Sequence, residues 1–368
     1  MIIPFVDLKT QYISIKMDID NAISSVIEET AFIRGKYVQQ FEKQFAELYD
    51  VKHCVSVANG TDALYIIMKM LGIKAGDEVI TAANSWISSS ETISQTGAKP
   101  VFIDVDEFFT MDVSKIESKI TKHTKAILPI HLYGQMADIS AIQKLCTKYN
   151  LYLIEDCAQS HFSEYEGKKA GLWGIAGSFS FYPGKNLGAY GDAGCIITND
   201  DSFAKKCRMY ANHGSLVKHD HIIEGINSRM DGLQASILCA KLPYILNWTE
   251  MRIKNAFLYN KYLASIKEIE LPRVKENTKH TFHLYVIKAE RRDELKSYLQ
   301  ENGVQSVINY PVPLPFMPAY AYLNIDRKEY KQVEINQSKI LSLPIFPEIK
   351  EEQIEYIAKI IKTFYASN

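Results

Sequence analysis

The chain lacks the compositional marks of several protein classes. It has 368 residues, with 42 Lys and Arg against 43 Asp and Glu, and a net charge of −1. Nucleic-acid-binding proteins normally carry a basic surplus, so the even balance argues against such a partner. No apolar run approaches the roughly 18 residues that a membrane-spanning helix needs. The first residues, MIIPFVDLKTQY, contain no charged segment, long apolar segment or cleavage site. These absences predict a cytoplasmic protein that binds neither membrane nor nucleic acid.

Cysteine is scarce and irregularly spaced. The six cysteines include no C-x-x-C pair, which argues against a disulfide framework and against a zinc site. We therefore expect free thiols in a reducing compartment and no bound metal. Glycine and proline show no strong bias, and the 47% of hydrophobic residues supplies enough apolar mass for a full core. The length suggests two or three domains.

From about residue 54 to residue 200, short apolar runs alternate with segments of helical periodicity. Strands alternating with helices predict parallel pairing in an α/β fold, and the lack of polar alternation in several runs predicts a sheet covered on both faces. The clearest helix is Asp138–Tyr149, with Asp138 as its N-cap. The expected strands are Cys54–Val57, Glu78–Thr81, Pro100–Ile103, Ala126–Ile130, Tyr152–Glu155, Gly177–Phe181 and Cys195–Thr198.

The character of the chain changes after about residue 229, and we predict a smaller α+β domain there. Helices are expected between Met230 and Ile266 with a break near Pro243, followed by a strand over His280–Ala289. A helix over Arg292–Asn302, a strand over Val304–Ile308, a Pro-rich loop and two closing helices complete the pattern. We place the boundary between a large domain, residues 1–245, and a small domain, residues 246–368.

The segment NGTDAL, Asn59 to Leu64, is the first candidate for a chemical role. It follows a strand and opens a helix, and Gly60 allows another backbone to approach closely. The N–H groups of Thr61 and Asp62 at such a helix N-terminus suit a phosphate. The alternative is an ordinary N-cap supplied by Thr61 or Asp62.

Two further candidates follow expected strands. Asp156 stands at the carboxyl end of an apolar strand, where ligands bind in open α/β sheets; the alternative is a helix N-cap. Lys185 lies four residues after Phe181, in a turn made by Pro183 and Gly184. A desolvated lysine in that turn has a lowered pKa and reacts with aldehydes; the alternative is an exposed surface lysine.

Two rival phosphate-binding loops are excluded by spacing. A Walker loop needs G-x-x-x-x-G-K followed by Ser or Thr, but Gly177 and Gly184 are too far apart and Asn186 follows the lysine. The dinucleotide-binding pattern G-x-G-x-x-G is absent.

Taken together, the three elements predict a pyridoxal phosphate site. The phosphate needs amides at a helix end, the pyridine nitrogen needs a carboxylate that keeps it protonated, and the aldehyde needs a lysine. Gly60–Thr61, Asp156 and Lys185 supply one of each.

Nearly the whole chain resembles the DegT/StrS nucleotide-sugar aminotransferases, which are fold-type I pyridoxal phosphate enzymes. The resemblance runs in order through FVDLKTQY, NGTDALYIIMKMLGIKAGDEVI, HLYGQMADI, IEDCAQSH, SFSFYPGKNLGAYGDAG, GINSRMDGLQASIL and YPVPLP. It implies a mainly parallel seven-stranded sheet flanked by helices, with a smaller C-terminal α+β domain.

The resemblance also implies roles for individual residues around the cofactor. Lys185 bonds to the cofactor aldehyde, Asp156 pairs with the pyridine nitrogen and Gln159 lies against the ring hydroxyl. Trp86 stacks on the ring, with a role as a core aromatic as the alternative. The phosphate is held by Gly60, Thr61, Ser180 and, from the partner subunit of an obligate homodimer with shared active sites, Asn227.

The stretch FYPGKNLGAYGDAG with DCAQSH resembles the branch of the family that acts at the sugar 3-position. This implies transfer of an amino group from L-glutamate to a dTDP-linked 3-keto-6-deoxyhexose, with pyridoxamine phosphate formed during turnover. His161 contacts substrate or orients its turn, and Tyr182 and Tyr310 are further substrate candidates. The alternatives are an aminotransferase for a 4-keto nucleotide sugar or a cyclic ketose, and a non-catalytic regulator that binds pyridoxal phosphate or a sugar nucleotide.

The chain departs from the family pattern at three positions. Phe162 stands where glycine is common, and Asn309 and Pro315 stand where histidines usually flank the YPxPL segment. These differences leave the cofactor chemistry unchanged, but they weaken the transfer of sugar contacts from the family to this chain.

Overall fold

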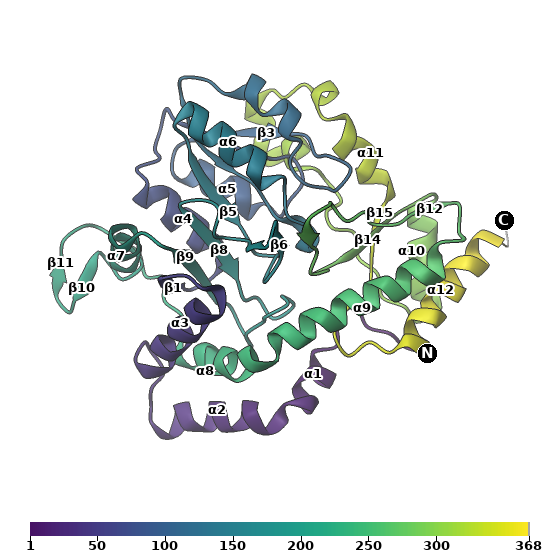
Figure 1. Cartoon of the computed structure of the whole chain (residues 1–368), viewed down its shortest axis with the longest axis horizontal. Helices are drawn as coiled ribbons and strands as arrows, with labels where there is room; N and C mark the ends of the chain where they lie inside the picture. The colour runs from purple at the N-terminus through teal and green to yellow at the C-terminus, as the bar shows by residue number, and fades with distance from the viewer. Residues whose placement is uncertain (367–368) are drawn as a thin grey trace.

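A seven-stranded sheet lies at the centre of the larger part of the molecule (Figure 1). The structure is a computed structural model and describes residues 1–366. The strand order is β1-β9-β8-β5-β4-β2-β3, with β9 antiparallel to both of its neighbours and the remaining pairs parallel. All seven expected strands are present, so the mainly parallel sheet is confirmed. Their bounds are β1 His53–Val57, β2 Glu78–Ala82, β3 Lys99–Ile103, β4 Thr124–Leu128, β5 Tyr152–Asp156, β8 Ala176–Ser180 and β9 Gly194–Thr198.

Helices cover both faces of this sheet, because neighbouring strand residues point to opposite sides and both sets are apolar. Val55 packs into the core beneath α4, α5 and α7, whereas Cys54 packs into the core beneath α3, α6 and α8. The predicted helix after Asp138 is α6, and the Asp138 side chain accepts a hydrogen bond from the Ala141 N–H. The helices are α1 Leu8–Ser14, α2 Lys16–Glu28, α3 Lys36–Tyr49, α4 Gly60–Met70, α5 Ser88–Gln95, α6 Ile139–Tyr149, α7 Asp201–Tyr210 and α8 Gly232–Lys241.

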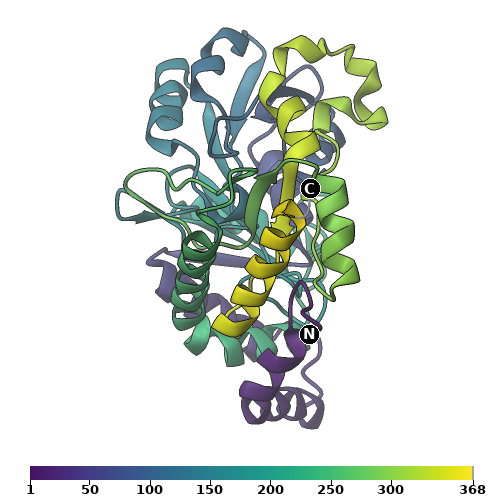
Figure 2. The same cartoon turned by 90° about the vertical axis from the view of Figure 1, so that its right-hand side faces the viewer.

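A second core forms near the two ends of the described chain, around a three-stranded antiparallel sheet. The long helix α9 joins the two cores: Trp248 in its first half belongs to the large core, and Tyr259 in its second half belongs to the small one. Helix α12 lies along α9 (Figures 1 and 2). The elements are β12 Ile269–Glu270, β14 Tyr285–Ala289, β15 Ile340–Leu343, α9 Ile245–Leu263, α10 Arg292–Glu301, α11 Lys331–Lys339 and α12 Glu351–Ala366. Helix α9 contributes to both cores, and Ile3, near the N-terminus, packs in the small core. The domain boundary after residue 245 therefore stays a prediction.

Short elements complete the fold. A hairpin of β10 Ser215–Val217 and β11 Asp220–His221 projects from the body beside α7 (Figure 1). A small sheet joins β6 Glu164–Tyr165, β7 Lys168–Lys169 and β13 Thr278–Lys279. The six cysteines are free thiols, as predicted. Within residues 1–366, no helix is long and apolar enough to cross a membrane.

Two strand predictions are wrong in the C-terminal part. The strand expected over His280–Ala289 begins only at Tyr285, because the backbone of Thr281 and Leu284 bonds instead to the turn at Tyr133 and Gly134. The segment Val304–Ile308 makes only isolated bridges, Val304 with Ile3 and Val307 with Ser342. Strand β15 was not predicted, because its four residues directly follow helix α11.

Candidate active site

The carboxyl ends of β1, β5 and β8 meet at one edge of the sheet, where ligands bind in open α/β folds. Gly60, the first residue of α4, brings the helix start against the end of β8. A Cβ atom on Gly60 would lie 2.7 Å from Ser180 Cβ, so a side chain there would separate the two elements. The close backbone approach predicted for Gly60 is therefore confirmed.

The first turn of α4 carries backbone amides and the Thr61 hydroxyl as possible hydrogen-bond donors. Asn59, rather than Thr61 or Asp62, is the N-cap, and its Oδ1 accepts the Asp62 N–H at 2.8 Å. The expectation that the Asp62 N–H faces outward is therefore wrong, and the Gly60 and Thr61 amides are what the first turn offers to an anion. The Thr61 hydroxyl lies 2.7 Å from the Ser88 hydroxyl at the start of α5. The sequence interpretation missed Ser88, although the run of three serines that opens α5 was a visible signal.

Asp156 is buried at the end of β5 and is held by two donors. Its Oδ1 accepts the Ala158 N–H at 3.1 Å, and its Oδ2 accepts the Ser89 hydroxyl at 2.9 Å. Residues 157–163 form a turn rather than a helix, and the next element is β6, so the N-cap alternative is wrong. Burial raises the pKa of Asp156, while these two hydrogen bonds and the charge of Lys185 act in the opposite direction.

Lys185 lies in a tight turn after β8, where its N–H donates to Tyr182 O at 2.8 Å. The side chain is half-buried, and within residues 1–366 its Nζ makes no hydrogen bond or ion pair. Desolvation lowers the pKa of Lys185 to about 8, and the negative charge of Asp156 opposes that shift. The desolvated amine predicted from the sequence is thus present, and the exposed-lysine alternative is wrong.

Gln159 links the turn at Tyr133 to Tyr310, the first residue of the Pro-rich loop. Its Oε1 accepts the Tyr133 N–H at 2.8 Å, and its Nε2 donates to the Tyr310 hydroxyl at 2.8 Å. The Trp86 ring centroid lies 5.9 Å from that of Tyr310, and Trp86 is 61% exposed. Its alternative role as a core aromatic is therefore wrong. Tyr182 is also exposed, so it does not pack in the core.

Two predicted residues have environments that do not by themselves indicate a role at this edge. His161 is fully buried, with its ring centroid 5.4 Å from that of Phe179 and 5.6 Å from that of Phe181. The burial of His161 favours the alternative that it orients its turn, and substrate contact by His161 stays a prediction. Asn227 is exposed and forms a β-bridge with Asn212, so its role toward a partner subunit stays a prediction.

The sequence interpretation also missed a buried pair, His131 and Glu155, that supports Asp156. The ring Nε2 of His131 lies 3.0 Å from the Glu155 carboxylate, and the backbone N–H of His131 donates to the backbone carbonyl of Asp156. With Cys157 the pair forms a group that could hold a metal, but the donor set does not fit one. His131 Nδ1 already accepts the Ala137 N–H, and the Glu155 carboxylate accepts the N–H groups of Gly171, Trp173 and Gly174.

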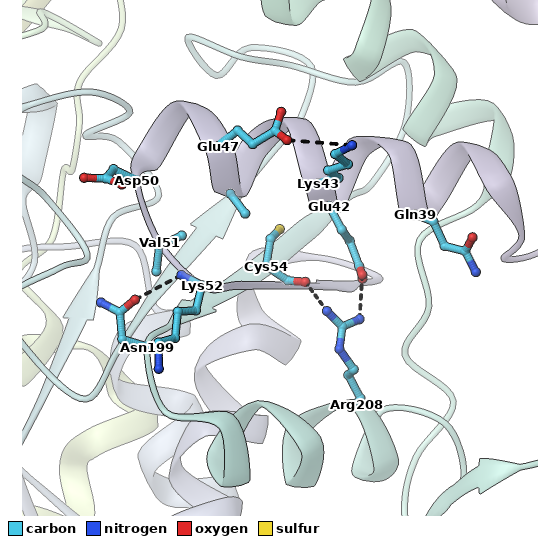
Figure 3. A pocket seen from close by; sticks show the side chains of 11 residues that line it. Gln39, Glu42, Lys43, Glu47, Asp50, Val51, Lys52, Cys54, Asn199 and Arg208 are labelled. Atoms are coloured by element: carbon cyan, nitrogen blue, oxygen red, sulfur yellow. Dashed lines mark hydrogen bonds and ion pairs between the residues drawn. The ribbon is translucent and has the colours of Figure 1, made fainter.

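A separate hollow of about 720 Å³ lies between α3, β1 and α7 (Figure 3). Two ion pairs lie among its lining residues, Arg208 with Glu42 and Lys43 with Glu47. Lys52 and Cys54 place it at the amino end of β1, whereas Gly60 follows the carboxyl end. The hollow is therefore not part of the Lys185 site.

Comparison with known proteins identifies the family. The profile of the DegT/DnrJ/EryC1/StrS aminotransferase family matches residues 13–362. The chain belongs to this family. It is 42% identical to a protein of Geobacillus stearothermophilus named pleiotropic regulatory protein, with 99% of each chain covered. It is 40% identical to the dTDP-3-amino-3,6-dideoxy-alpha-D-galactopyranose transaminase of Aneurinibacillus thermoaerophilus, over 98% of this chain and 99% of that one.

Solved structures agree with this assignment. The crystal structure of S. venezuelae DesV in complex with a ketimine intermediate superposes with a TM-score of 0.96, at 37% identity and with 98% of each chain covered. The protein is a pyridoxal-phosphate-dependent sugar aminotransferase with the fold of that enzyme class. The resemblance inferred from the sequence is thereby confirmed for family, fold, cofactor and type of reaction.

Proposed function

We propose that the protein transfers the amino group of L-glutamate to the C3 keto group of a dTDP-linked 3-keto-6-deoxyhexose. The product would be dTDP-3-amino-3,6-dideoxy-galactose or -glucose. The observation that carries the transamination is the desolvated, unpaired amine of Lys185 at the edge that also holds Asp156 and the α4 N-terminus. The named activity of the 40% identical transaminase supports the choice of a dTDP sugar and of C3. We also retain a cytoplasmic location as a prediction.

The residues at this edge fit pyridoxal phosphate. Its phosphate would be held by the Gly60 and Thr61 amides and the Ser180 hydroxyl. These groups lie close together because Gly60 has no side chain to separate α4 from β8. Asp156 would hold the pyridine nitrogen, Gln159 the ring hydroxyl and Trp86 the ring face. The bound cofactor supplies an aldehyde for the amino group and an electron sink.

The chain's own residues then move and stabilise protons. The Lys185 Nζ takes the proton from the Cα of the amino donor and returns it during reaction with the keto sugar. Its pKa of about 8 leaves a usable fraction of neutral amine near neutral pH. The Asp156 carboxylate stabilises the proton on the pyridine nitrogen, and its bonds from Ala158 and Ser89 hold it in one orientation. Tyr182 and Tyr310 are proposed to line the sugar.

Lys185→Ala tests the lysine assignment. We expect loss of the reducible visible chromophore and of turnover, whereas Lys359→Ala, at an exposed position of α12, leaves both unchanged. Absorbance with and without borohydride and a coupled glutamate assay measure the two effects. Appreciable transamination by Lys185→Ala would show that another residue forms the covalent link.

A panel of nucleotide keto-sugars with glutamate, analysed by mass spectrometry, tests the substrate. The proposal expects the largest gain of an amino group with dTDP-3-keto-6-deoxyhexoses. A preference for 4-keto sugars would contradict it and support the second aminotransferase reading. The name of the 42% identical relative favours a regulator as the other candidate. Tight binding of pyridoxal phosphate without glutamate consumption on any sugar would support that candidate.

We also propose a homodimer with shared active sites, in which Asn227 reaches the cofactor phosphate of the partner subunit. Its exposure, and the projecting hairpin that precedes it in the chain, support this role (Figure 1). The test mixes two inactive variants, Asn227→Ala and Lys185→Ala, after subunit exchange. Because one mixed site would carry neither substitution, activity should reappear. No recovery from subunits shown by mass to have exchanged would place Asn227 in its own chain's site.

A further inference from the structure

Asn186, the residue after Lys185, is held by hydrogen bonds at both the nitrogen and the oxygen of its side-chain amide. Asn186 is buried, its Nδ2 donates to Thr281 O at 3.3 Å, and its Oδ1 lies 3.1 Å from His283 Nδ1. Because a backbone carbonyl only accepts, Nδ2 must face Thr281 and Oδ1 must face His283. The His283 Nδ1 therefore carries a proton and donates it to Asn186.

The charge state of His283 fits that arrangement. Desolvation holds the pKa of His283 well below its usual value, and the charges of Lys185, Arg252 and His161 act in the same direction. The ring is therefore neutral, with its one proton on Nδ1. Asp156, His161 and His283 interact electrostatically with Lys185, and Asp156 is the acidic group among these three.

The segment that carries His283 is itself fixed to the active-site edge. The Thr281 N–H donates to Gly134 O at 3.1 Å, and the Leu284 N–H donates to Tyr133 O at 3.2 Å. A Cβ atom on Gly134 would lie 2.8 Å from Phe282 N, so the two backbones are in contact. These bonds explain why residues 280–284 do not extend β14. They also link His283 to the Tyr133 turn, which donates to Gln159.

The far end of the lysine loop has a similar contact. The Lys241 Nζ donates to Gly188 O at 2.7 Å, and a Cβ atom on Gly188 would lie 2.2 Å from Pro183 O. The loop between β8 and β9 is thus fixed at Asn186 and at Gly188, on both sides of Leu187. Lys185 has no bond of its own through Nζ within the described residues, so its position depends on these neighbours.

We propose that His283 and Asn186 form a positioning pair for Lys185, in which the neutral Nδ1–H form of His283 fixes Asn186 and thereby holds the lysine amine in its desolvated position. The pair joins the loop after β8 to the segment before β14. This inference rests on the role of Lys185 proposed above. Its test uses cofactor-free protein, so the outcome is independent of the sugar and of the amino donor.

The experiment measures the reactivity of Lys185 with an amine-reactive reagent as a function of pH, by mass spectrometry of its peptide. In the unmodified protein, the labelling midpoint is expected near the pKa of about 8. In His283→Leu and Asn186→Ala, we expect the midpoint to rise toward the ordinary lysine value of about 10.4, because the released side chain regains water. We expect His283→Asn to restore the low midpoint, because its amide nitrogen replaces the Nδ1 donor.

His280 provides a matched control. It is equally buried on the same segment, but it accepts the Phe282 N–H and has no hydrogen bond to the lysine loop. His280→Leu should leave the labelling midpoint of Lys185 unchanged. The thermal unfolding of each variant shows whether it is folded, so a shift of the midpoint can be assigned to the position of Lys185 rather than to unfolding. An unchanged midpoint in His283→Leu and Asn186→Ala, an equal shift in His280→Leu, or failure of folded His283→Asn to restore the midpoint would each overturn the proposal. If Lys185→Ala keeps the chromophore while these shifts occur, the proposed catalytic role fails but the positioning pair stands.

Discussion

Replacing Lys185 with methionine should stabilise the cofactor-free protein at neutral pH. The lysine is desolvated and makes no hydrogen bond or ion pair through Nζ within residues 1–366, so its positive charge costs folding free energy there. Methionine keeps a long side chain in the same space and carries no charge. The prediction therefore concerns a residue that the proposed reaction needs and the fold does not.

The magnitude follows from the pKa shift. A fall from 10.5 to about 8, at about 1.36 kcal/mol per unit, corresponds to about 3 kcal/mol against folding at neutral pH. Because the side chain is half-buried and partly screened, we expect about 1–3 kcal/mol. The sign is set by proton linkage: the folded-state pKa is lowered, so the unfolded state binds more protons between pH 8 and pH 10.5. This group's contribution to stability therefore rises with pH through that window.

The assay is urea unfolding of the cofactor-free protein at neutral pH and at about pH 10, for the natural protein, Lys185→Met and the exposed control Lys359→Met. The stability advantage of Lys185→Met should shrink as pH rises, because the natural lysine loses its charge. The control should show no such change. Parallel pH profiles for the natural protein and Lys185→Met would refute the reasoning, since a gain from methionine packing alone would not depend on pH.

Three further substitutions test the site around this lysine. Gly60→Ala places a Cβ atom 2.7 Å from Ser180 Cβ, so it should lower the free energy of unfolding by about 1–3 kcal/mol. It should also weaken pyridoxal phosphate binding, measured by absorbance titration. An unchanged affinity would contradict the proposed phosphate site at Gly60 and Ser180. Trp86→Ala should change the free energy of unfolding by no more than about 0.5 kcal/mol, because the ring is exposed. It should nevertheless weaken cofactor binding. An affinity equal to that of the natural protein would show that Trp86 does not stack on the cofactor. Glu155→Gln should lower the free energy of unfolding by about 3 kcal/mol in urea, because it leaves the buried donors around His131 imperfectly paired; a loss below about 1 kcal/mol would show that the pair is not stabilising.

The sheet and the three principal site residues could be predicted because each leaves a local mark in the sequence. The strands buried on both faces are continuous apolar runs, and parallel order follows from the helices between them. Asp156 ends such a run, and Lys185 follows another after a short turn with Pro183 and Gly184, at the edge where ligands bind. Gly60 was found because it opens a helix immediately after a strand.

The parts that could not be predicted depend on contacts between distant segments. Residues 280–284 have the composition of a strand, but their backbone bonds to Tyr133 and Gly134, about 150 residues earlier in the chain. Glu155 stands beside Asp156, and only the structure shows that the first carboxylate bonds to His131 and backbone amides, whereas the second bonds to Ala158 and Ser89. His161 is polar in sequence and fully buried between aromatic rings. No periodicity or spacing distinguishes these cases.

The opposite pKa shifts of Asp156 and Lys185 have one physical origin. Burial raises the first and lowers the second, so in the cofactor-free protein each charge is desolvated and both work against folding near neutral pH. In the proposed site, Asp156 would hold the ring nitrogen of pyridoxal phosphate, and Lys185 would bond to its aldehyde. Binding in this arrangement would remove both costs, and a ligand that binds only the folded state stabilises it by an amount that grows with the logarithm of its concentration divided by its Kd. The same desolvation that makes Asp156 and Lys185 costly in the cofactor-free fold would therefore suit them to the roles proposed for them once the cofactor is bound.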